Sequence, residues 1–430
     1  MENKNISMRL IIMNFLEFAV WGAYLTSMGS FLAGAGFGPQ IWLFFATQGF
    51  VSIFMPALMG IVADKWIPAQ KVLSLCQGLA GIFMLGAGVY ASASGASIQF
   101  APFYLLYLLS VAFFMPTIAI ANSVAYNALE ISGKDPVKDF PPIRVFGTVG
   151  FIVSMLFVNF MKGSDGVQFQ HSANQFITSG ILGLVLCAYA LTMPNCPCKP
   201  NGAGEQSLAD SLGLSAFKLF KQKKFAIFFI FSMLLGASLQ VTNGYANTFI
   251  SSFADLPGYE NAWGARNANA LISLSQISET LCILLIPFAM KKFKIKGVML
   301  IAMFAWVFRF GFFGIGNPGP GVWLFVLSCI VYGVAFDFFN ISGSLYVNEN
   351  TDKSIRSSAQ GLFMLMTNGL GASIGTFAAG RVVNALVYNP QAAGQAGNWA
   401  GAWYIFAAYA LVVAVLFAIL FKNPDKEQKA

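Results

Sequence analysis

Six ionisable side chains stand inside long apolar stretches of this sequence. Such a group costs about 2.5–3.5 kcal/mol within a hydrocarbon layer on insertion scales, so it usually faces a partner, a cavity or a path for protons or ions. Three are acids and three are bases, which permits internal pairing: Glu17, Arg144, Glu279, Arg309, Asp337 and Arg381. The chemistry that these residues indicate is polar recognition and proton binding inside an apolar protein.

Three polar or aromatic residues share one helical face in the stretch DFPPIRVFGTVGF. Arg144, Thr148 and Phe151 follow one another at i, i+4 and i+7, which places them on one side of a helix. A guanidinium, a hydroxyl and a ring together suit a planar polar ligand. The two prolines before Arg144 predict that the helix starts there. A buried ion pair that only joins helices is the alternative.

Two further apolar stretches each carry a pair of polar residues at i and i+3. Gln240 and Asn243 form one pair, and Gln276 and Glu279 form the other. A side-chain amide offers both a donor and an acceptor, so amides beside a carboxylate suit a ligand with mixed polar edges. Amides also join membrane helices, at about 0.6 kcal/mol each on average, and that interpretation stays open for both pairs.

The stretch VYGVAFDFFNISGS combines an aromatic wall with an acid. Tyr332 and Phe336 are spaced at i and i+4, and Asp337 adjoins their face. This pattern is expected beside a ligand site that has a titratable group. Asn340 on its own fits a core amide with satisfied hydrogen bonds.

The remaining buried charges carry less weight. Glu17, Trp21 and Tyr24 repeat the i, i+4, i+7 spacing and either extend a cavity or pack one helix on another. For Arg309 and Arg381, which lie toward the outer halves of their helices, structural pairing or snorkelling to the outer interface is the expected role.

Cysteine and histidine chemistry has little support. The only close cysteine pair is Cys196 and Cys198, and the single histidine is His171. This arrangement has no zinc spacing and no nucleophile with a histidine base. We expect reduced, structural cysteines, no bound metal and no cofactor.

The composition is that of an integral membrane protein. Of 430 residues, 57% are hydrophobic and 10% are charged, and the mean hydropathy is +0.68, whereas soluble domains carry about 25% charged residues. A spanning helix needs about 20 apolar residues. Segments of this kind predict an all-α protein with twelve transmembrane helices, at 9–35, 41–62, 71–91, 100–123, 143–162, 174–193, 226–252, 266–290, 297–315, 320–347, 357–386 and 399–421. We interpret the first as a retained helix and not as a signal peptide.

The longest polar interruption divides these spans into six and six. The predicted organisation is an N-terminal half at 1–193, a cytoplasmic linker at 194–224 and a C-terminal half at 225–430. The linker piece SLADSLGLSAFKLF is expected to lie along the membrane surface. Basic residues concentrate in the leader, the even-numbered loops and the tail, so both termini are predicted to be cytoplasmic. The net charge of +8 is thus explained without nucleic acid.

Two-half bundles with a midplane site are a recurring transporter design, and a loop motif supports one here. Gly60, Asp64 and Lys65 in GIVADKW resemble the cytoplasmic loop motif of the major facilitator superfamily. The corresponding loop of the second half, MKKFKIKG, lacks the acid, so a solvated turn with positive-inside lysines is the alternative.

A more specific resemblance covers most of the chain. The stretches MPALMGIVADKW, DFPPIRVFGTVGF, FAIFFIFSMLLGASLQVTN, SLSQISETL, VYGVAFDFFNISGS and SAQGLFMLMTNG resemble the bacterial nucleoside:proton symporters of that superfamily. The resemblance implies a monomeric symporter in the cell inner membrane that takes up nucleosides such as uridine and adenosine with protons. Which nucleosides it prefers stays open.

The resemblance also implies which residues contact the nucleoside, from the fifth, seventh, eighth and tenth helices. They are Arg144, Thr148, Phe151, Gln240, Asn243, Gln276, Glu279, Tyr332 and Phe336. Asp337 is the implied proton-linked acid, and Glu279 is the alternative. A sugar or polyol symporter of the same superfamily is the second functional hypothesis. A membrane-embedded enzyme or a channel is the third, although the position of His171 in a loop argues against a hydrolase.

Overall fold

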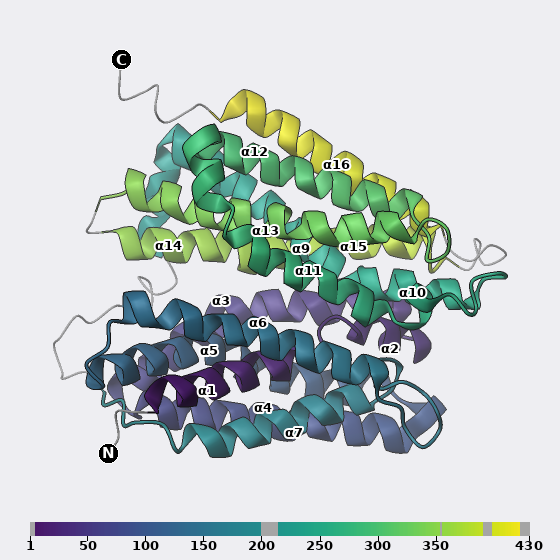
Figure 1. Cartoon of the computed structure of the whole chain (residues 1–430), viewed down its shortest axis with the longest axis horizontal. Coiled ribbons are helices and arrows are strands. Elements are labelled where there is room, and N and C mark those ends of the chain that lie inside the picture. Colours follow the sequence, from purple (N-terminus) through teal and green to yellow (C-terminus); the bar gives the residue numbers. More distant parts are fainter. Residues whose placement is uncertain (1–4, 199–213, 353–354, 390–397, 422–430) are drawn as a thin grey trace. The chain divides into compact units, whose positions relative to one another are not determined.

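The structure is a computed structural model that describes residues 5–198, 214–352, 355–389 and 398–421 (Figure 1). These residues form helices joined by turns, apart from an isolated β-bridge between Lys162 and Gln168. Within this part of the chain, nine helices are long and apolar enough to cross a membrane, and Asn174–Ala190 is a shorter apolar helix. The all-α membrane architecture is therefore confirmed, while twelve crossings remain a prediction.

The nine long helices overlap nine of the expected spans, and three expected spans differ. The expected span 9–35 consists of α1 (Ile6–Gly22) and α2 (Met28–Gly34), separated by a turn. The span 174–193 is the shorter α7 (Asn174–Ala190). The span 266–290 comprises the end of α10 (Trp263–Arg266), α11 (Ala268–Ile283) and the first residues of the next helix. Two of these spans are interrupted and one is shortened. The apolar character of a stretch of about 20 residues does not show where a helix breaks or ends.

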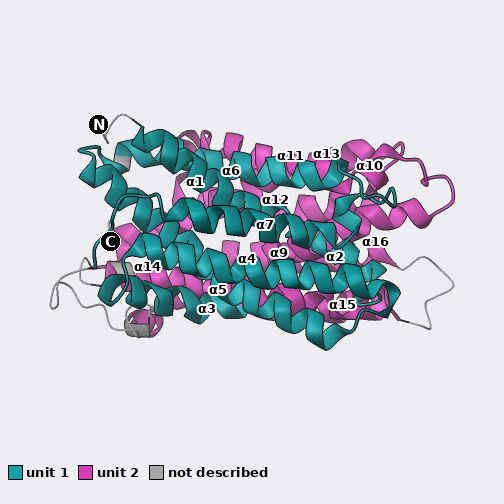
Figure 2. Cartoon of the chain, turned by 90° about the horizontal axis from the view of Figure 1, so that it is seen from below, with its two compact units in different colours: residues 1–37, 50–208 teal, residues 38–49, 209–430 magenta. Residues whose placement is uncertain are grey.

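The chain forms two compact units, and the first comprises residues 1–37 and 50–208 (Figure 2). Besides α1, α2 and α7 it holds α4 (Ala69–Ser94), α5 (Phe100–Ile131), α6 (Pro136–Phe160) and most of α3 (Ile41–Lys65). Helix α4 packs on α5 and α7, and α1 packs on α6 and α7. The helices of this unit therefore lie side by side (Figure 2).

The second unit comprises residues 38–49 and 209–430, so the first turns of α3 belong to it. Its longer helices are α9 (Lys223–Ser252), α12 (Ile286–Ile315), α13 (Val322–Asn350), α15 (Ala372–Leu386) and α16 (Trp399–Leu420). Helix α14 (Arg356–Met364) continues into a π-helical segment, Leu365–Gly371, which packs against α9. Helix α13 packs on both α11 and α12.

The start of α6 differs from the expected one. The helix begins at Pro136, so Pro141 and Pro142 lie inside it and not at its start. Proline is well tolerated at the first helical position, where its missing N–H has no partner to lose, and Pro136 fills that position. Arg144 therefore lies two turns into the helix.

The expected linker is only partly described, because residues 199–213 lie outside the described part. A short 3-10 helix covers Leu214–Lys221, and α9 begins at Lys223, two residues before the expected boundary. Residues 390–397, which follow α15 in the sequence, also lie outside the described part.

Cys196, near the start of the expected linker, is buried. Its backbone N–H donates to Gln70 Oε1 at 2.9 Å, and its side chain joins the core of the first unit. Burial raises the pKa of the Cys196 thiol to about 11, so the group stays protonated at neutral pH and is a poor nucleophile.

Candidate functional site

A close crossing of α11 and α13 brings two predicted acids together. A Cβ atom at Gly333 would lie 2.5 Å from the carbonyl oxygen of Ser278, so only glycine permits this approach. Glu279 follows Ser278 on α11, and Asp337 lies one turn after Gly333 on α13. The two carboxyl groups consequently interact electrostatically.

Replacing Gly333 with alanine is expected to destabilise the protein by about 1–3 kcal/mol, since overpacking forces the two helices apart. The measurement is the thermal unfolding midpoint in detergent. Gly311 on α12 is the matched control, because a Cβ atom there meets nothing within 4 Å and alanine favours a helix. Equal midpoints for Gly333→Ala and the unmodified protein would show that the crossing is not tight.

One oxygen atom of the buried Asp337 carboxyl group lacks a hydrogen-bond partner among the described residues. The residue is 5% exposed, and this atom is its Oδ2. A buried polar atom without a partner is costly. A proton or a hydrogen-bonding ligand would remove that cost, so Asp337 is suited to bind either.

Tyr332 lies among several other predicted site residues on α11 and α13. Its ring stacks on Phe336, with centroids 5.8 Å apart and planes 5° apart. Its hydroxyl lies beside Gln276, and it interacts electrostatically with Glu279 and Asp337. The structure thus brings five of the predicted residues on α11 and α13 into one neighbourhood. We call these residues the acidic cluster: Gln276, Glu279, Tyr332, Phe336 and Asp337.

Arg309 on α12 supplies the cation beside this cluster. It is 2% exposed, and its Nη1 donates to the Ser328 carbonyl at 2.7 Å and to Ser275 Oγ at 3.3 Å. Its guanidinium lies 4.5 Å from the centre of the Tyr332 ring. Of the two roles expected for Arg309, structural pairing within the protein fits these contacts, whereas snorkelling to the outer interface does not, because its partners lie inside the unit. Arg381 on α15 is exposed.

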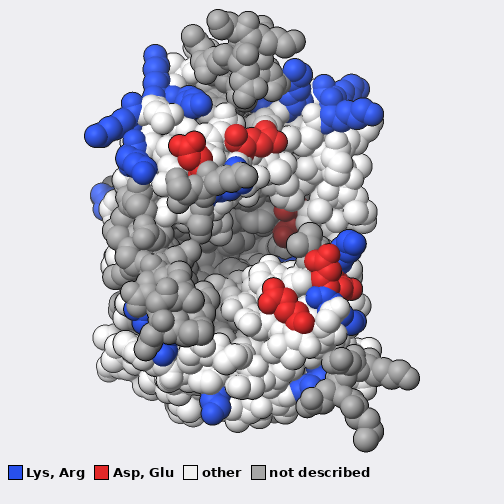
Figure 3. Space-filling model, turned by 90° about the vertical axis from the view of Figure 1, so that its left-hand side faces the viewer, with Lys and Arg blue, Asp and Glu red and all other residues white. Residues whose placement is uncertain are grey.

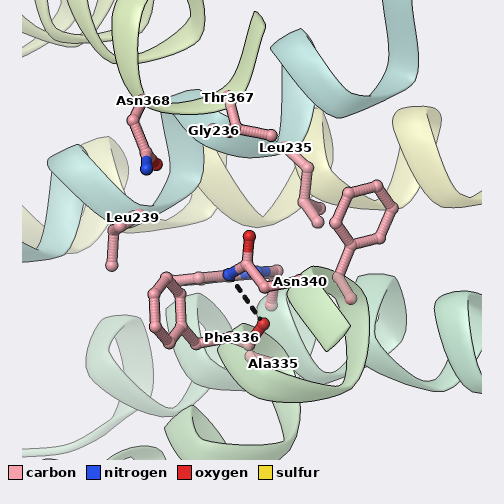
Figure 4. A pocket seen from close by; sticks show the side chains of 10 residues that line it. Leu235, Gly236, Leu239, Ala335, Phe336, Asn340, Thr367 and Asn368 are labelled. Atoms are coloured by element: carbon pink, nitrogen blue, oxygen red, sulfur yellow. Dashed lines mark hydrogen bonds between the residues drawn. The ribbon is translucent and has the colours of Figure 1, made fainter. Parts of the chain in front are cut away.

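A small pocket lies beside the cluster, between α9, α12, α13 and the π-helical segment (Figure 4). Phe336 and Asn340 line it from α13, and Asn340 Nδ2 donates to the Phe336 carbonyl at 3.0 Å. Thr367 and Asn368 line it from the π-helical segment. The sequence argument missed these last two, although adjacent polar residues in the apolar stretch FMLMTNG are a usable signal.

The predicted amides on α9 do not line this pocket. Gln240 and Asn243 are both half-buried. The Oε1 atom of Gln240 is buried and has no hydrogen-bond partner among the described residues. That atom is suited to accept a hydrogen bond from a ligand.

The predicted face of α6 lies in the first unit. The Arg144 guanidinium lies over the Phe18 ring, 3.9 Å from its centroid. Phe151 is buried and meets Trp21 edge-on, with centroids 6.3 Å apart. Thr148, one turn from Arg144, is half-buried. This face therefore packs against α1, with both polar residues partly accessible.

Glu17 on α1 is fully buried and hydrogen-bonded. Its Oε2 accepts from Gln77 Nε2 at 2.8 Å, and its Oε1 lies 2.6 Å from Thr117 Oγ1. Neither Gln77 nor Thr117 was singled out in the sequence, because neither is ionisable.

Long apolar helices that carry amides, carboxyl groups and guanidinium groups in their interior are typical of polytopic membrane transporters. Comparison with known proteins specifies the family. Residues 4–426 match the family described as nucleoside H+ symporter, and the chain belongs to that family.

Three similar proteins or structures cover nearly the full chain. A xanthosine permease of Escherichia coli is 44% identical over 99% of this chain and 98% of its own length. The nucleoside permease NupG of the same organism is 42% identical over 97% and 96%, respectively. A crystal structure of the nucleoside transporter NupG superposes with a TM-score of 0.87 at 41% identity, covering 97% of this chain and 100% of that one.

Proposed function

We propose that this protein takes up nucleosides across the cytoplasmic membrane together with protons. The observation that carries the proposal is the family match over residues 4–426, which includes every element of the acidic cluster. The names of the similar permeases support nucleosides as the substrate class. Uridine and adenosine are the first candidates, and the proton is the coupling ion, with no other cofactor.

The proposed architecture has twelve transmembrane helices, with halves at 1–193 and 225–430 joined by the linker at 194–224, in the manner of the major facilitator superfamily. Both termini are cytoplasmic, and the functional unit is a monomer in the cell inner membrane. On the face seen in Figure 3, lysine and arginine side chains are more frequent than aspartate and glutamate side chains, which are also present. Such an excess supports a cytoplasmic assignment for that face.

Both units contribute to nucleoside recognition in this proposal. From the first unit, Arg144 and Thr148 hydrogen-bond the ligand, and Phe151 contacts its base. From the second unit, the hydrogen-bonding groups are the side chains of Gln240, Asn243, Gln276 and Glu279, and the aromatic contacts are Tyr332 and Phe336. The unpartnered Gln240 oxygen and the half-buried Arg144 support such roles.

Asp337 couples the proton to the substrate, with Glu279 as the second candidate. The two carboxyl groups interact electrostatically. When both are ionised they repel one another, so a proton bound to one of them lowers the energy of the pair. Protonation from outside would also offer an O–H donor to a nucleoside. The loaded, neutralised carrier then alternates its access to the two sides of the membrane.

The function is tested in liposomes that contain the purified protein. Uridine added outside should drive protons inward, and an imposed proton gradient should drive labelled uridine to accumulate. Unlabelled adenosine should compete for uptake, whereas a disaccharide should not. Competition by the disaccharide alone would instead favour the sugar symporter, and uridine entry with no proton flux would contradict coupling.

A further inference from the structure

The hydrogen bonds around Glu17 require a proton that the ionised side chain lacks. Thr117 Oγ1 lies 2.6 Å from Glu17 Oε1 and 2.6 Å from the Phe114 carbonyl oxygen. Both distances are those of O–H···O hydrogen bonds. A hydroxyl group has one proton to donate, so it can satisfy only one of these two oxygens.

Gln77 cannot supply the missing proton to either contact of Thr117. Its Nε2 donates one hydrogen to Glu17 Oε2 at 2.8 Å and the other to Thr117 Oγ1 at 2.9 Å. Turning the amide round would place its oxygen, another acceptor, against the carboxyl group. With Glu17 ionised, one of the two short oxygen–oxygen contacts of Thr117 therefore has no hydrogen between its atoms.

A proton on Glu17 Oε1 resolves this arrangement. The carboxyl O–H then donates to Thr117 Oγ1, and Thr117 donates to the Phe114 carbonyl. Thr117 accepts two hydrogen bonds and donates one, which is its full capacity. Glu17 and Thr117 are both fully buried, so solvent does not supply alternative partners.

We propose that Glu17 is a second proton-binding residue of the transport cycle, occupied by a proton in the conformation described here. This inference rests on the proposed proton-coupled function and extends it to the first unit. Loss of the proton leaves two acceptors competing for Thr117, so deprotonation favours a different packing of α1 against α4 and α5.

The charged and titratable groups around Glu17 are consistent with a residue that changes its charge. Arg144 interacts with it electrostatically from α6, and Cys76 does so from α4. On α7, the Tyr189 hydroxyl is bonded to the Arg9 carbonyl, two turns earlier on α1. Arg144 is therefore the cation that faces this acid, and it is also a proposed nucleoside contact.

A direct route leads from Glu17 to the predicted nucleoside residues on α6. Trp21, one turn after Glu17, meets the Phe151 ring, and Gly22 packs against the Phe151 backbone so closely that a Cβ atom would clash. A shift of α1 must therefore move Phe151, since packed helices do not yield independently. Proton binding at Glu17 is in this way linked to nucleoside affinity.

The test is Glu17→Gln, whose amide keeps the hydrogen bonds of the protonated acid but cannot titrate. Infrared spectra of the unmodified protein should contain the C=O band of a protonated carboxyl group that is absent from this variant. Uridine binding should persist but lose part of its dependence on pH. In the unmodified protein, one proton at 100 mV supports a ratio of inside to outside uridine of roughly fifty. In Glu17→Gln this ratio should fall at least about tenfold, while exchange of labelled for unlabelled uridine persists.

The matched control is Glu130→Gln, at an exposed position on α5. It should change neither the infrared band, nor the pH dependence of binding, nor the accumulation of uridine.

Further variants keep the inference testable if Glu17→Gln does not fold. Thr117→Val removes the proposed acceptor and should shift the protonated-carboxyl band, whereas Thr117→Ser keeps the hydroxyl and should not. An unchanged band in Thr117→Val, or unaltered pH dependence and accumulation in Glu17→Gln, would overturn the role of Glu17. Absence of uridine-driven proton flux in the unmodified protein would instead overturn the proposed function itself.

Discussion

Replacing Asp337 with asparagine is expected to abolish proton-driven accumulation of uridine while leaving uridine binding measurable. An inward potential supplies about 2.3 kcal/mol per charge per 100 mV, which supports roughly fifty-fold accumulation for one proton per cycle. Asparagine has nearly the same shape as the protonated acid but cannot release a proton. The variant should therefore bring uridine only to equal concentrations on the two sides of a liposome.

The measurement is the ratio of labelled uridine inside to outside under an imposed proton gradient. Asp255→Asn is a suitable control, because Asp255 is exposed at the end of a short 3-10 helix. Glu279→Gln should be measured in parallel, since either acid of the pair could hold the proton. Continued accumulation by Asp337→Asn, with loss in Glu279→Gln, would transfer the coupling role to Glu279.

Replacing Arg144 with alanine is expected to weaken uridine binding by about ten- to a hundredfold. A hydrogen bond from a charged group contributes about 1.5–3 kcal/mol, and the substitution removes every donor of the guanidinium. It also removes the contact of that group with the Phe18 ring. Calorimetric titration of the purified protein with uridine gives the dissociation constant directly.

Two further variants make that result specific to the Arg144 position. Arg144→Lys keeps the positive charge but not the planar pair of donors, so it should recover only part of the affinity. Arg381→Ala removes an exposed arginine from α15 and should leave binding unchanged. An unaltered dissociation constant in Arg144→Ala would exclude Arg144 from the binding site.

Helical spacing predicted several neighbourhoods that the structure reproduces. Residues at i and i+4, such as Tyr332 and Phe336, stack on one another, because the spacing alone determines that they share a face. The same argument placed Arg144 and Thr148 together. The separate argument from prolines was wrong for the start of α6, because the helix begins at Pro136 and not at Pro141 or Pro142.

The sequence alone did not predict which side chains of different helices contact one another. The role of Arg309 depends on a carbonyl oxygen of Ser328 and on the Tyr332 ring, and neither can be located without the packing of α12 on α13. Glu17, Trp21 and Tyr24 carried less weight in the sequence because tryptophan and tyrosine are common where helices pack. The partners of Glu17, Gln77 and Thr117, come from two other helices.

The sequence by itself determined the membrane character, the helical periodicity and the identity of the buried charges, because these depend on composition and on local backbone geometry. Only the tertiary structure decided which charges meet. The Glu279–Asp337 pair exists because Gly333 lets α11 and α13 approach closely. The oxygen atoms around Thr117 indicate a proton on Glu17 because three helices converge there. Such pairings depend on distances between separate helices, which no periodicity along one helix encodes.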